Sequence, residues 1–505
     1  MRTVLQDMMP IAFFKELEMT KLKKHQQLLH FYYMNAFQNH YRKDGDCLYQ
    51  PKYNRMGQFT YSYEYVFDIS DFVFQSLFPI EQNQYWFECL TDKGNNASVC
   101  TASLTNIKSE WLPDLVRNPD IHSFENGLFV ISANTFFYFK KTPGKRSVDE
   151  LNGNLMAIKY HNIVFDEQGM EDDMARFPTR HYMGIDMPYV HQILDTQNFS
   201  TAEREWIFAL LGRLLTPLGK RDAWGVFPYF LGLAGTGKST CLRLVASLLE
   251  ARDVGYLNNT LQKTFALEGI FDKILYLALD IDEYFQLDQA TFQSMVVGEE
   301  VSVLRKFKRP LTKLWDIHGG FAGNKLPPWQ DNGGSLSRRL IVIEFQRLVT
   351  KCDPQLFEKC LDQRDRFLYV ISSAYKQKSN RYRTRGIKEV LPDKFRNSEK
   401  KALMELNCLL SFVTSTCDID EADPGNKTYI QPFKAFNQCF KDFCKRGSIK
   451  PKALNYSFYS SVFAKFQITV EEPESKNDDP FGQDCKYILG LKLKDKVIEQ
   501  MQEDK

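Results

Sequence analysis

The sequence predicts an α/β core built on a parallel sheet, with an α+β region before it and a small region of helices and two strands after it. Three patterns support the core. A glycine-rich loop stands between an apolar strand and a helix at residues 226–250, a second apolar strand at 273–279 ends in acidic residues, and a third ends at Asn324. Short apolar runs that alternate with helical segments are typical of parallel sheets.

Composition places limits on the class of protein. At 505 residues the chain is long enough for two or three domains, and its 14% aromatic content excludes extensive disorder. The net charge is only +2, so a nucleic-acid partner must be met by local basic patches. The 11 cysteines include no C-x-x-C pair, which indicates reduced thiols. The apolar patch at 8–14 is neither a signal peptide nor a membrane span, so we expect an intracellular protein with no membrane partner.

The region before the core is expected to mix helix and strand. A helical start at 13–37 is followed by an alternating strand at 59–67, and Asn126-Gly127 predicts a hairpin turn. Asp68-Ile69-Ser70-Asp71 could be the paired acids of a polymerase-type primase, but no convincing histidine or third acid for such a site follows. A surface turn is therefore preferred there. The acidic stretch at 166–173 is expected to be an exposed loop.

The core begins with a helix and a phosphate-binding loop. Ser200 and Glu203 form a capping box for an amphipathic helix that leads to the strand at 226–231. The loop after that strand fits G-x-x-x-x-G-K-[ST], and its glycines allow a tight turn that aims backbone N–H groups at phosphate oxygens. A helix N-terminus adds positive potential. The predicted nucleotide-binding residues are Gly232, Ala234, Gly235, Thr236, Gly237, Lys238, Ser239 and Thr240.

These residues predict binding of ATP with Mg²⁺. Lys238 is expected to reach the β and γ phosphates, and Ser239 to hold the metal ion. The alternative, an ordinary glycine turn, is disfavoured by the strand and helix on either side. The acids Asp280, Asp282 and Glu283 follow the second strand, where one acid holds Mg²⁺ and another polarises the attacking water. Spacing does not decide which acid does which, and a solvated acidic turn is the alternative.

Three further segments complete the candidate site. Residues 301–310 form an alternating strand that runs into a basic tip with one aromatic residue, and 314–317 return from it. Asn324 ends the next strand, where its amide can orient water or contact the γ-phosphate. Arg338 and Arg339 precede the apolar run 340–345.

The C-terminal part is expected to be mainly helical. Helices are predicted up to about 375, near 402–416, at 431–445 and at 457–465, and strands at 466–470 and 487–493. Helices followed by a β-hairpin describe a winged helix. Its Lys450, Lys452, Tyr456 and Tyr459 could face DNA or a protein. The basic stretch 376–401 is expected to be a solvated face or linker, with a DNA-contacting collar as the alternative.

Phosphate loop, strand-end acids, strand-end asparagine and arginine stand in one order within 108 residues, Gly232 to Arg339. This arrangement resembles the viral superfamily 3 helicase domain, an AAA+ ATPase, and within it the helicases of large DNA viruses, such as the poxvirus-type primase-helicases. The resemblance is specific over 195–345. It departs from the family in its Asp-Ile-Asp-Glu acid cluster and in Gly319-Gly320.

The resemblance implies roles for two segments. Residues 298–308 match the stretch that in the papillomavirus helicase forms a hairpin projecting into the ring channel, which makes Arg305, Lys306, Phe307 and Lys308 the expected DNA contacts. A solvent-exposed charged hairpin is the alternative. Ser337-Arg338-Arg339 matches the arginine-finger segment and favours Arg339 over Arg338, with an ion pair within the subunit as the alternative. Lys238, Asp280, Asp282, Glu283, Asn324 and Arg339 are thus the expected catalytic residues, and Ser239, Asp280 and Asp282 the metal ligands.

The function that the resemblance implies is an ATP-dependent DNA helicase that forms a ring, expected to be hexameric, and unwinds duplex DNA in viral replication. Its partners would be single-stranded or forked DNA and other replication proteins, inside a virus-infected cell. An ATPase for packaging or assembly, a bifunctional primase-helicase and an RNA substrate remain alternatives. The expected organisation is an α+β region at 1–120, an accessory region at 121–195, the ATPase at 196–350, a helical and basic linker at 351–401 and the winged-helix-like domain at 402–505.

Overall fold

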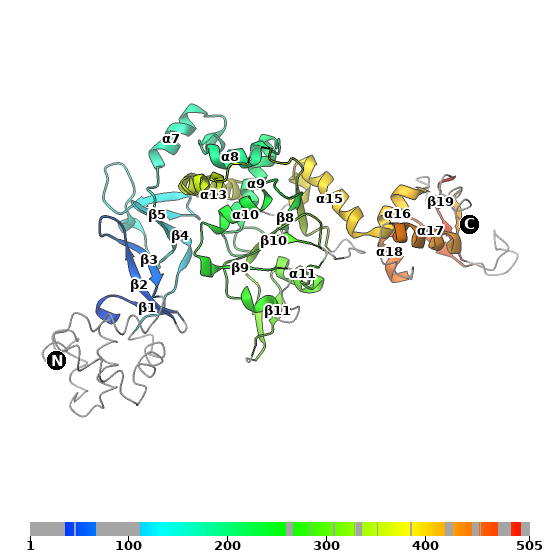
Figure 1. Cartoon of the computed structure of the whole chain (residues 1–505), viewed down its shortest axis with the longest axis horizontal. Coiled ribbons are helices and arrows are strands. Elements are labelled where there is room, and N and C mark those ends of the chain that lie inside the picture. Colours follow the sequence, from blue (N-terminus) through cyan, green and yellow to red (C-terminus); the bar gives the residue numbers. More distant parts are fainter. Residues whose placement is uncertain are drawn as a thin grey trace, which may run out of the picture. The chain divides into compact units, whose positions relative to one another are not determined.

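The computed structural model forms two compact units, which are described separately below (Figure 1). The first unit contains Met1–Asp186, Leu248–Glu250 and Asp362–Ser373, and the second contains the rest of the chain. The structure describes residues 36–44, 47–66, 112–258, 266–282, 284–306, 309–327, 329, 336–350, 352–383, 386–419, 428–446, 454, 456–472 and 486–495. The acids of 68–71 and most of the helix expected at 13–37 lie outside these ranges.

The first unit holds two sheets. A three-stranded antiparallel sheet has the order β1-β2-β3, and a four-stranded sheet has the order β6-β5-β4-β7. The strands are β1 (Arg42–Asp44), β2 (Cys47–Tyr53), β3 (Phe59–Tyr65), β4 (Asn118–Phe124), β5 (Gly127–Val130), β6 (Thr135–Tyr138) and β7 (Ala157–His161). The strand expected at 59–67 is present up to Tyr65. The predicted hairpin is also confirmed, but its turn is Glu125-Asn126 and lies one residue earlier than the Asn-Gly pair indicated, because Phe124 pairs with Gly127 in antiparallel register.

The acidic stretch at 166–173 is not the exposed loop that its composition indicated. It lies mostly within a helix, α7 (Glu167–Arg176), which begins where the Asp166 side chain accepts a hydrogen bond from Gly169 N at 3.0 Å. Arg366, far along the chain, pairs with Asp166 at 2.7 Å and with Asp173. A side-chain cap and a distant cation thus stabilise a helix that acidic composition alone disfavours.

A pair of histidines is buried between β4 and β7. His122 Nδ1 lies 3.0 Å from His161 Nε2, and the two rings stack with their centroids 5.3 Å apart. Both side chains are fully buried. Burial, and then the charge of Lys159, lowers the pKa of His122 to about 3. Burial, and then the charges of His122, Lys159 and Arg364, hold the pKa of His161 well below 6.5. Both imidazoles are therefore neutral in the folded unit.

This pair predicts that the first unit loses stability in mild acid. In the unfolded chain both imidazoles would take up protons near pH 6.5, whereas the folded pKa values lie lower. The stabilisation is therefore fully present above about pH 6.5 and falls as the pH drops toward the folded pKa, by up to about 1.4 kcal/mol per pH unit and imidazole. Thermal melts from pH 7.5 to 5, followed by circular dichroism, measure it. His181→Asn, at an exposed histidine, should leave this slope unchanged, and a flat profile in the unaltered protein would contradict the prediction.

The second unit is organised around a five-stranded sheet, which confirms the predicted parallel α/β core. Its strand order is β14-β8-β13-β10-β9, and every neighbouring pair is parallel. The strands are β8 (Phe227–Gly232), β9 (Val254–Tyr256), β10 (Leu275–Ile281), β13 (His318–Gly323) and β14 (Leu340–Phe345). The strand expected at 273–279 is shifted by two residues, so Asp280 still belongs to β10.

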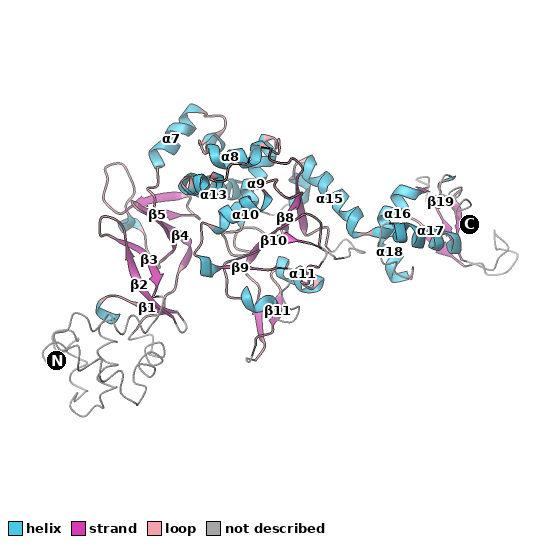
Figure 2. Cartoon of the chain, viewed as in Figure 1, coloured by secondary structure: helices cyan, strands magenta, loops and turns pink. Residues whose placement is uncertain are grey.

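Helices cover this sheet (Figure 2). Helix α10 (Lys238–Ala246) contacts β8, β13 and β10, while α11 (Gln289–Val297) buries Phe292 against Phe321 of β13. The predicted capping box begins α9 (Thr201–Arg213), which follows α8 (Pro188–Asp195). Every residue of α9 from 206 to 213 is buried. This part of the helix is therefore enclosed on all sides, and the expectation of an amphipathic helix was wrong.

Close packing explains the two glycines that depart from the family pattern. A Cβ atom at Gly319 would come within 2.4 Å of the Tyr276 ring on one face of the sheet. A Cβ atom at Gly320 would come within 2.9 Å of Leu242 of α10 on the other face. Neither position has room for a side chain, because a large ring and the phosphate-loop helix occupy the space.

A buried ion pair connects α9 to the residues before β8. Arg213 donates to both carboxylate oxygens of Asp222 at 2.8 and 2.9 Å and to Val226 O at 2.8 Å. The Tyr375 hydroxyl donates to the same carboxylate at 2.6 Å. Burial raises the pKa of Asp222, but the charge and hydrogen bonds of Arg213 outweigh it and lower the pKa overall. The Arg213–Asp222 pair, whose hydrogen bonds are all made within the protein, thus holds the segment between α9 and β8 in place.

The remaining elements are mostly helical, as expected. They are η2 (Val148–Glu150), η3 (His181–Gly184), η4 (Ala251–Asp253), η5 (Ala266–Gly269), α12 (Leu356–Leu361), α13 (Arg364–Tyr382), α14 (Ile387–Val390), α15 (Asp393–Leu406), α16 (Cys408–Thr416), α17 (Phe433–Arg446) and α18 (Tyr456–Lys465). The helix expected at 402–416 is divided at Asn407, whose side chain caps α16. Much of the basic stretch 376–401 is helical. None of the helices in the described ranges is long and apolar enough to cross a membrane.

Residues 408–495 contain a core of their own. Besides α16 to α18 they hold β15 (Cys417–Ile419), β16 (Ile430–Pro432), β17 (Thr469–Glu471), β18 (Tyr487–Leu489) and β19 (Leu491–Leu493). The single strand expected at 487–493 is two strands, separated at Gly490, whose φ is +86°. Cys439 and Cys444 are buried in this core, and the cysteines that the structure describes carry free thiols. Lys450 and Lys452 lie outside the described residues.

Candidate nucleotide-binding site

The phosphate loop connects β8 to α10 through two left-handed glycines. Gly235 has a φ of +74° and Gly237, which precedes the first residue of α10, has a φ of +93°. Side chains with a Cβ disfavour this region, and a Cβ at Gly237 would also come within 3.0 Å of Ile193. Within the loop, the Thr236 hydroxyl donates to Leu233 O at 2.9 Å. The backbone thus has the turn that the sequence predicted at the N-terminus of a helix.

Lys238 joins the loop to the end of β13. Its Nζ donates to Leu233 O at 2.8 Å and to Asn324 Oδ1 at 3.1 Å. Asn324 directly follows β13, so the expected strand-end amide lies next to the expected phosphate-binding lysine. Burial lowers the pKa of Lys238, and the Asp280 carboxylate acts in the opposite direction.

Ser239 and Asp280 lie at adjoining positions. The Ser239 hydroxyl donates to Leu279 O at 3.0 Å, and Leu279 directly precedes Asp280 on β10. Hydroxyl and carboxylate oxygens are ligands that Mg²⁺ takes when the rest of its shell is water and phosphate, and Ser239 and Asp280 bring one of each to this end of β10. The residues present therefore fit the expected metal ion.

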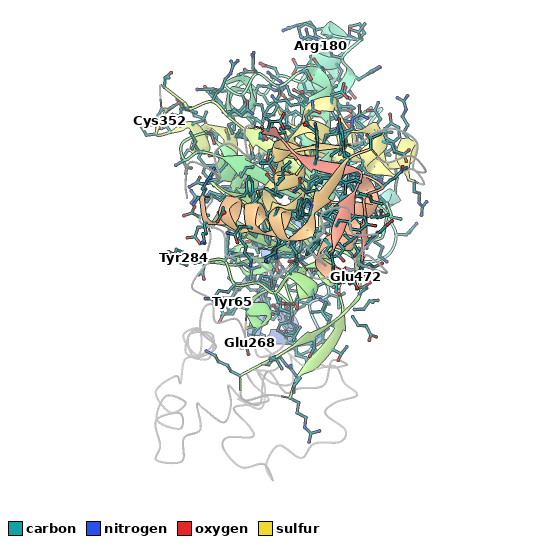
Figure 3. All side chains as sticks on the ribbon, turned by 90° about the vertical axis from the view of Figure 1, so that its right-hand side faces the viewer. Tyr65, Arg180, Glu268, Tyr284, Cys352 and Glu472 are labelled. Carbon is teal, nitrogen blue, oxygen red and sulfur yellow. The ribbon has the colours of Figure 1, made fainter. Side chains whose placement is uncertain are left out.

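The other two acids differ from Asp280. Asp282 Oδ1 accepts a hydrogen bond from Tyr284 N at 2.7 Å, so this carboxylate caps the turn after β10. Tyr284 itself is 69% exposed and projects from the surface (Figure 3). Glu283 lies outside the described residues. Asp280 is the acid whose charge acts on Lys238, and after burial it is the second cause of the raised pKa of Tyr229.

A glutamine that the sequence did not single out braces the loop. Gln197 is buried, and its Nε2 donates to Thr236 O at 3.0 Å and to Arg347 O at 2.7 Å. Its Oε1 accepts from Arg347 N at 3.0 Å. Val349 N also donates to Gly235 O at 3.2 Å. The residues after β14 and the phosphate loop are therefore tied to each other, directly and through one amide.

The basic tip is carried by an antiparallel hairpin, β11 (Glu300–Val303) and β12 (Leu311–Leu314), which forms its own two-stranded sheet (Figure 1). Arg305 donates to Arg309 O at 3.2 and 2.8 Å, so its guanidinium group closes the turn. Lys306 is exposed, and its backbone N donates to Glu268 at 3.0 Å. Phe307 and Lys308 lie outside the described residues.

The two candidate finger arginines differ in exposure. Arg338 is exposed, whereas Arg339 is buried at 8%. Arg339 O accepts a hydrogen bond from Phe227 N at 2.7 Å, which places it at the start of β8. The phosphate loop follows the other end of that six-residue strand, roughly 17–20 Å away. Arg339 therefore lies far from the phosphate loop of its own chain.

The chain was compared with family models, curated proteins and solved structures. Residues 230–339 match a family model described as a family of unknown function, DUF5906. No curated protein matches the chain. Among solved structures, "The apo structure of NrS-1 C terminal region (305-718)" is 11% identical with a TM-score of 0.37, covering 61% of this chain and 76% of that one. "The A form apo structure of NrS-1 C terminal region-CTR" is 15% identical with a TM-score of 0.32, covering 60% and 76%.

Proposed function

We propose that this chain is an ATP- and Mg²⁺-dependent DNA helicase of the superfamily 3, AAA+ type, which forms a ring and unwinds duplex DNA during viral replication. The observation that carries the proposal is the bond from Lys238 Nζ to Asn324 Oδ1 at 3.1 Å. It brings the ends of β8 and β13 to one point, next to Asp280 at the end of β10. A cation, an amide and a carboxylate at one phosphate loop are the parts that nucleotide hydrolysis needs.

Each residue has a role in that proposal. The loop N–H groups and Lys238 hold the phosphates, Ser239 and Asp280 hold Mg²⁺, and Asn324 orients the water or contacts the γ-phosphate. The metal ion, when bound, neutralises charge on the phosphate oxygens. Asp282 and Glu283 remain candidates for the acid that polarises water. The helices and antiparallel strands of 408–495 support the proposal of a winged-helix-like domain.

The separation of Arg339 from its own phosphate loop supports the ring. An arginine at that distance can complete a site only on a neighbouring subunit, and head-to-tail contacts of this kind close into rings. In such a ring, Lys306 on the turn of a separate hairpin would follow the phosphates of a single strand in the channel.

The test is strand displacement on duplexes with 3′ or 5′ single-stranded tails, with ATP and Mg²⁺, beside the Lys238→Ala variant. The proposal expects unwinding of one tailed duplex by the unaltered protein and none by the variant. ATP turnover without unwinding, and without stimulation by single-stranded DNA, would instead favour a packaging or assembly ATPase.

The hairpin gives a second expectation. Lys306→Ala combined with Phe307→Ala should abolish unwinding while ATP turnover without DNA stays within about twofold, because the tip contacts DNA and not the nucleotide. Lys273→Ala, at a lysine paired with Asp272, is a matched control that should leave both activities unchanged. Equal loss of unwinding and of turnover without DNA would contradict the role of the hairpin.

A further inference from the structure

The first unit contains a cavity of about 580 Å³ outside the nucleotide-binding site. Five aromatic rings and one cation line it, and together they are called the aromatic cavity: Phe37, Tyr41, Arg42, Tyr53, Phe59 and Tyr63. The Phe59 ring lies 6.0 Å from the Tyr53 ring and 5.7 Å from the Tyr63 ring, measured between centroids. The rings are thus close enough to form one continuous surface.

In strand β3 the polar side chains are buried and the aromatic side chains are partly exposed, which is the reverse of an ordinary half-buried strand. Its small polar residues Thr60 and Ser62 face inward, with 0% and 4% exposure. Phe59 and Tyr63, on the other face, are only partly buried. Tyr53 of β2 is 53% exposed. Aromatic residues in strands normally pack inward, so this exposed aromatic face calls for a ligand with flat apolar surfaces.

Arg42 gives the cavity a fixed positive charge. Its guanidinium group lies 5.6 Å from the Tyr63 ring centroid, and its Nε donates to the Tyr63 hydroxyl at 3.0 Å. None of the described residues that line the aromatic cavity is acidic. A ligand that combines a flat ring with a negative group fits this charge and shape.

A second cavity, of about 550 Å³, shares Arg42 and Met156 with the first. The arginine therefore stands between two hollows. Its Nη1 reaches Asp114 O at 3.4 Å, on the side of the second hollow. Asp114, whose carboxylate pairs with Lys43 at 3.7 Å, also lines the second hollow, so the charge that suits a phosphate is the Arg42 guanidinium group at the boundary between the two. A cation at that boundary matches a polymer with a phosphate between successive bases better than it matches an isolated ring.

We propose that the aromatic cavity binds single-stranded nucleic acid, with a base stacked on the Tyr53 and Phe59 rings and the adjoining phosphate on Arg42. Base-on-ring stacking together with a cation is the way proteins hold single strands without reading their sequence. This contact lies in the first unit and adds to the hairpin contact of the proposed helicase. A polypeptide partner is the competing occupant, and the binding and cross-linking experiments below distinguish the two.

The test is the binding of a fluorescein-labelled oligothymidylate of about 10 nucleotides to the full-length protein without ATP, followed by anisotropy. Tyr53→Leu and, separately, Arg42→Gln are expected to weaken binding between about 5-fold and about 100-fold. Tyr65→Leu is the matched control, since Tyr65 is an exposed tyrosine of the same sheet outside the aromatic cavity (labelled in Figure 3). It should bind like the unaltered protein, and ATP turnover without DNA should be unchanged in all three variants.

Cross-linking locates the contact independently. An oligonucleotide with 4-thiothymidine, irradiated in the complex, should attach to a peptide within residues 47–63, and Lys306→Ala should keep that cross-link. The inference would be overturned if Tyr53→Leu and Tyr65→Leu bound the oligonucleotide with equal affinity, or if cross-links formed only outside residues 47–63. A polypeptide would then be the remaining candidate for the aromatic cavity. Lost affinity in Lys306→Ala alone would overturn it while the helicase proposal stands. Binding that depends on Tyr53 in a protein without ATP turnover would support the inference and reject the helicase.

Discussion

Replacing Lys238 with alanine is expected to reduce ATP hydrolysis by about 10²–10³-fold without unfolding the core. The Nζ atom is held at 2.8 Å from Leu233 O and 3.1 Å from Asn324 Oδ1, so the ammonium group lies at the loop where we propose that the phosphates bind. Removing the ammonium group removes the charge that stabilises the transferring phosphoryl group. Leu233 and Asn324 are exposed, so water can replace the two lost hydrogen bonds.

Phosphate release at saturating ATP measures this effect, and a thermal melt of the same sample reports the fold. Lys220→Ala is the matched control, because Lys220 is an exposed lysine of the same unit and is not part of the phosphate loop. Turnover in Lys238→Ala within a few-fold of the unaltered protein would mean that the loop is not the hydrolytic site. The proposed function would then fail at its first step.

The second large effect is expected from the arginines before β14. Loss of an arginine finger reduces turnover by about 10³–10⁵-fold. Arg339→Ala alone should therefore be inactive, as should Lys238→Ala alone. Mixing the two inactive proteins in equal amounts should restore activity, because about a quarter of the interfaces then receive an intact lysine and an intact arginine from different subunits.

Exposure makes Arg338 the necessary comparison. Arg338 is exposed and Arg339 is 8% exposed, so Arg339→Ala should also lower thermal stability whereas Arg338→Ala should not. The arginine whose alanine variant is inactive alone and regains activity when mixed with Lys238→Ala is the finger. Recovery with Arg338→Ala would reassign the role that the family resemblance favours for Arg339. Recovery with neither would exclude an arginine of this segment acting across subunits.

Much of the core could be predicted because its signals are local. The phosphate loop and its flanking strand and helix occupy one stretch of sequence. The sequence also marked the positions of Asp280 and Asn324 at strand ends, and the parallel sheet brings them to the same loop. The sequence could not distinguish Asp280 from Asp282, because their difference depends on which carboxylate the turn binds.

Features that depend on distant contacts could not be predicted. Gln197 has three hydrogen bonds to the loop and to Arg347, but a glutamine before a helix has no distinctive pattern. The helix α7 depends on Arg366, about 190 residues further along the chain. The His122–His161 pair exists because β4 and β7 are parallel neighbours. The spacing of residues along the sequence does not show which strands will pair.

The position of β14 has a consequence for how subunits would take turns. Its first residue follows Arg339, and the residues just beyond its last one are bonded to the phosphate loop through Gln197 and Val349. Strand β14 thus has the residues bonded to the phosphate loop beyond its last residue, and the arginine that we propose for the next subunit's site before its first residue. In the proposed ring, a shift of β14 on nucleotide binding would therefore move Arg339 relative to the neighbouring subunit's catalytic centre. We therefore expect the subunits of the proposed ring to hydrolyse ATP one after another around the ring, with each subunit setting the timing of the next.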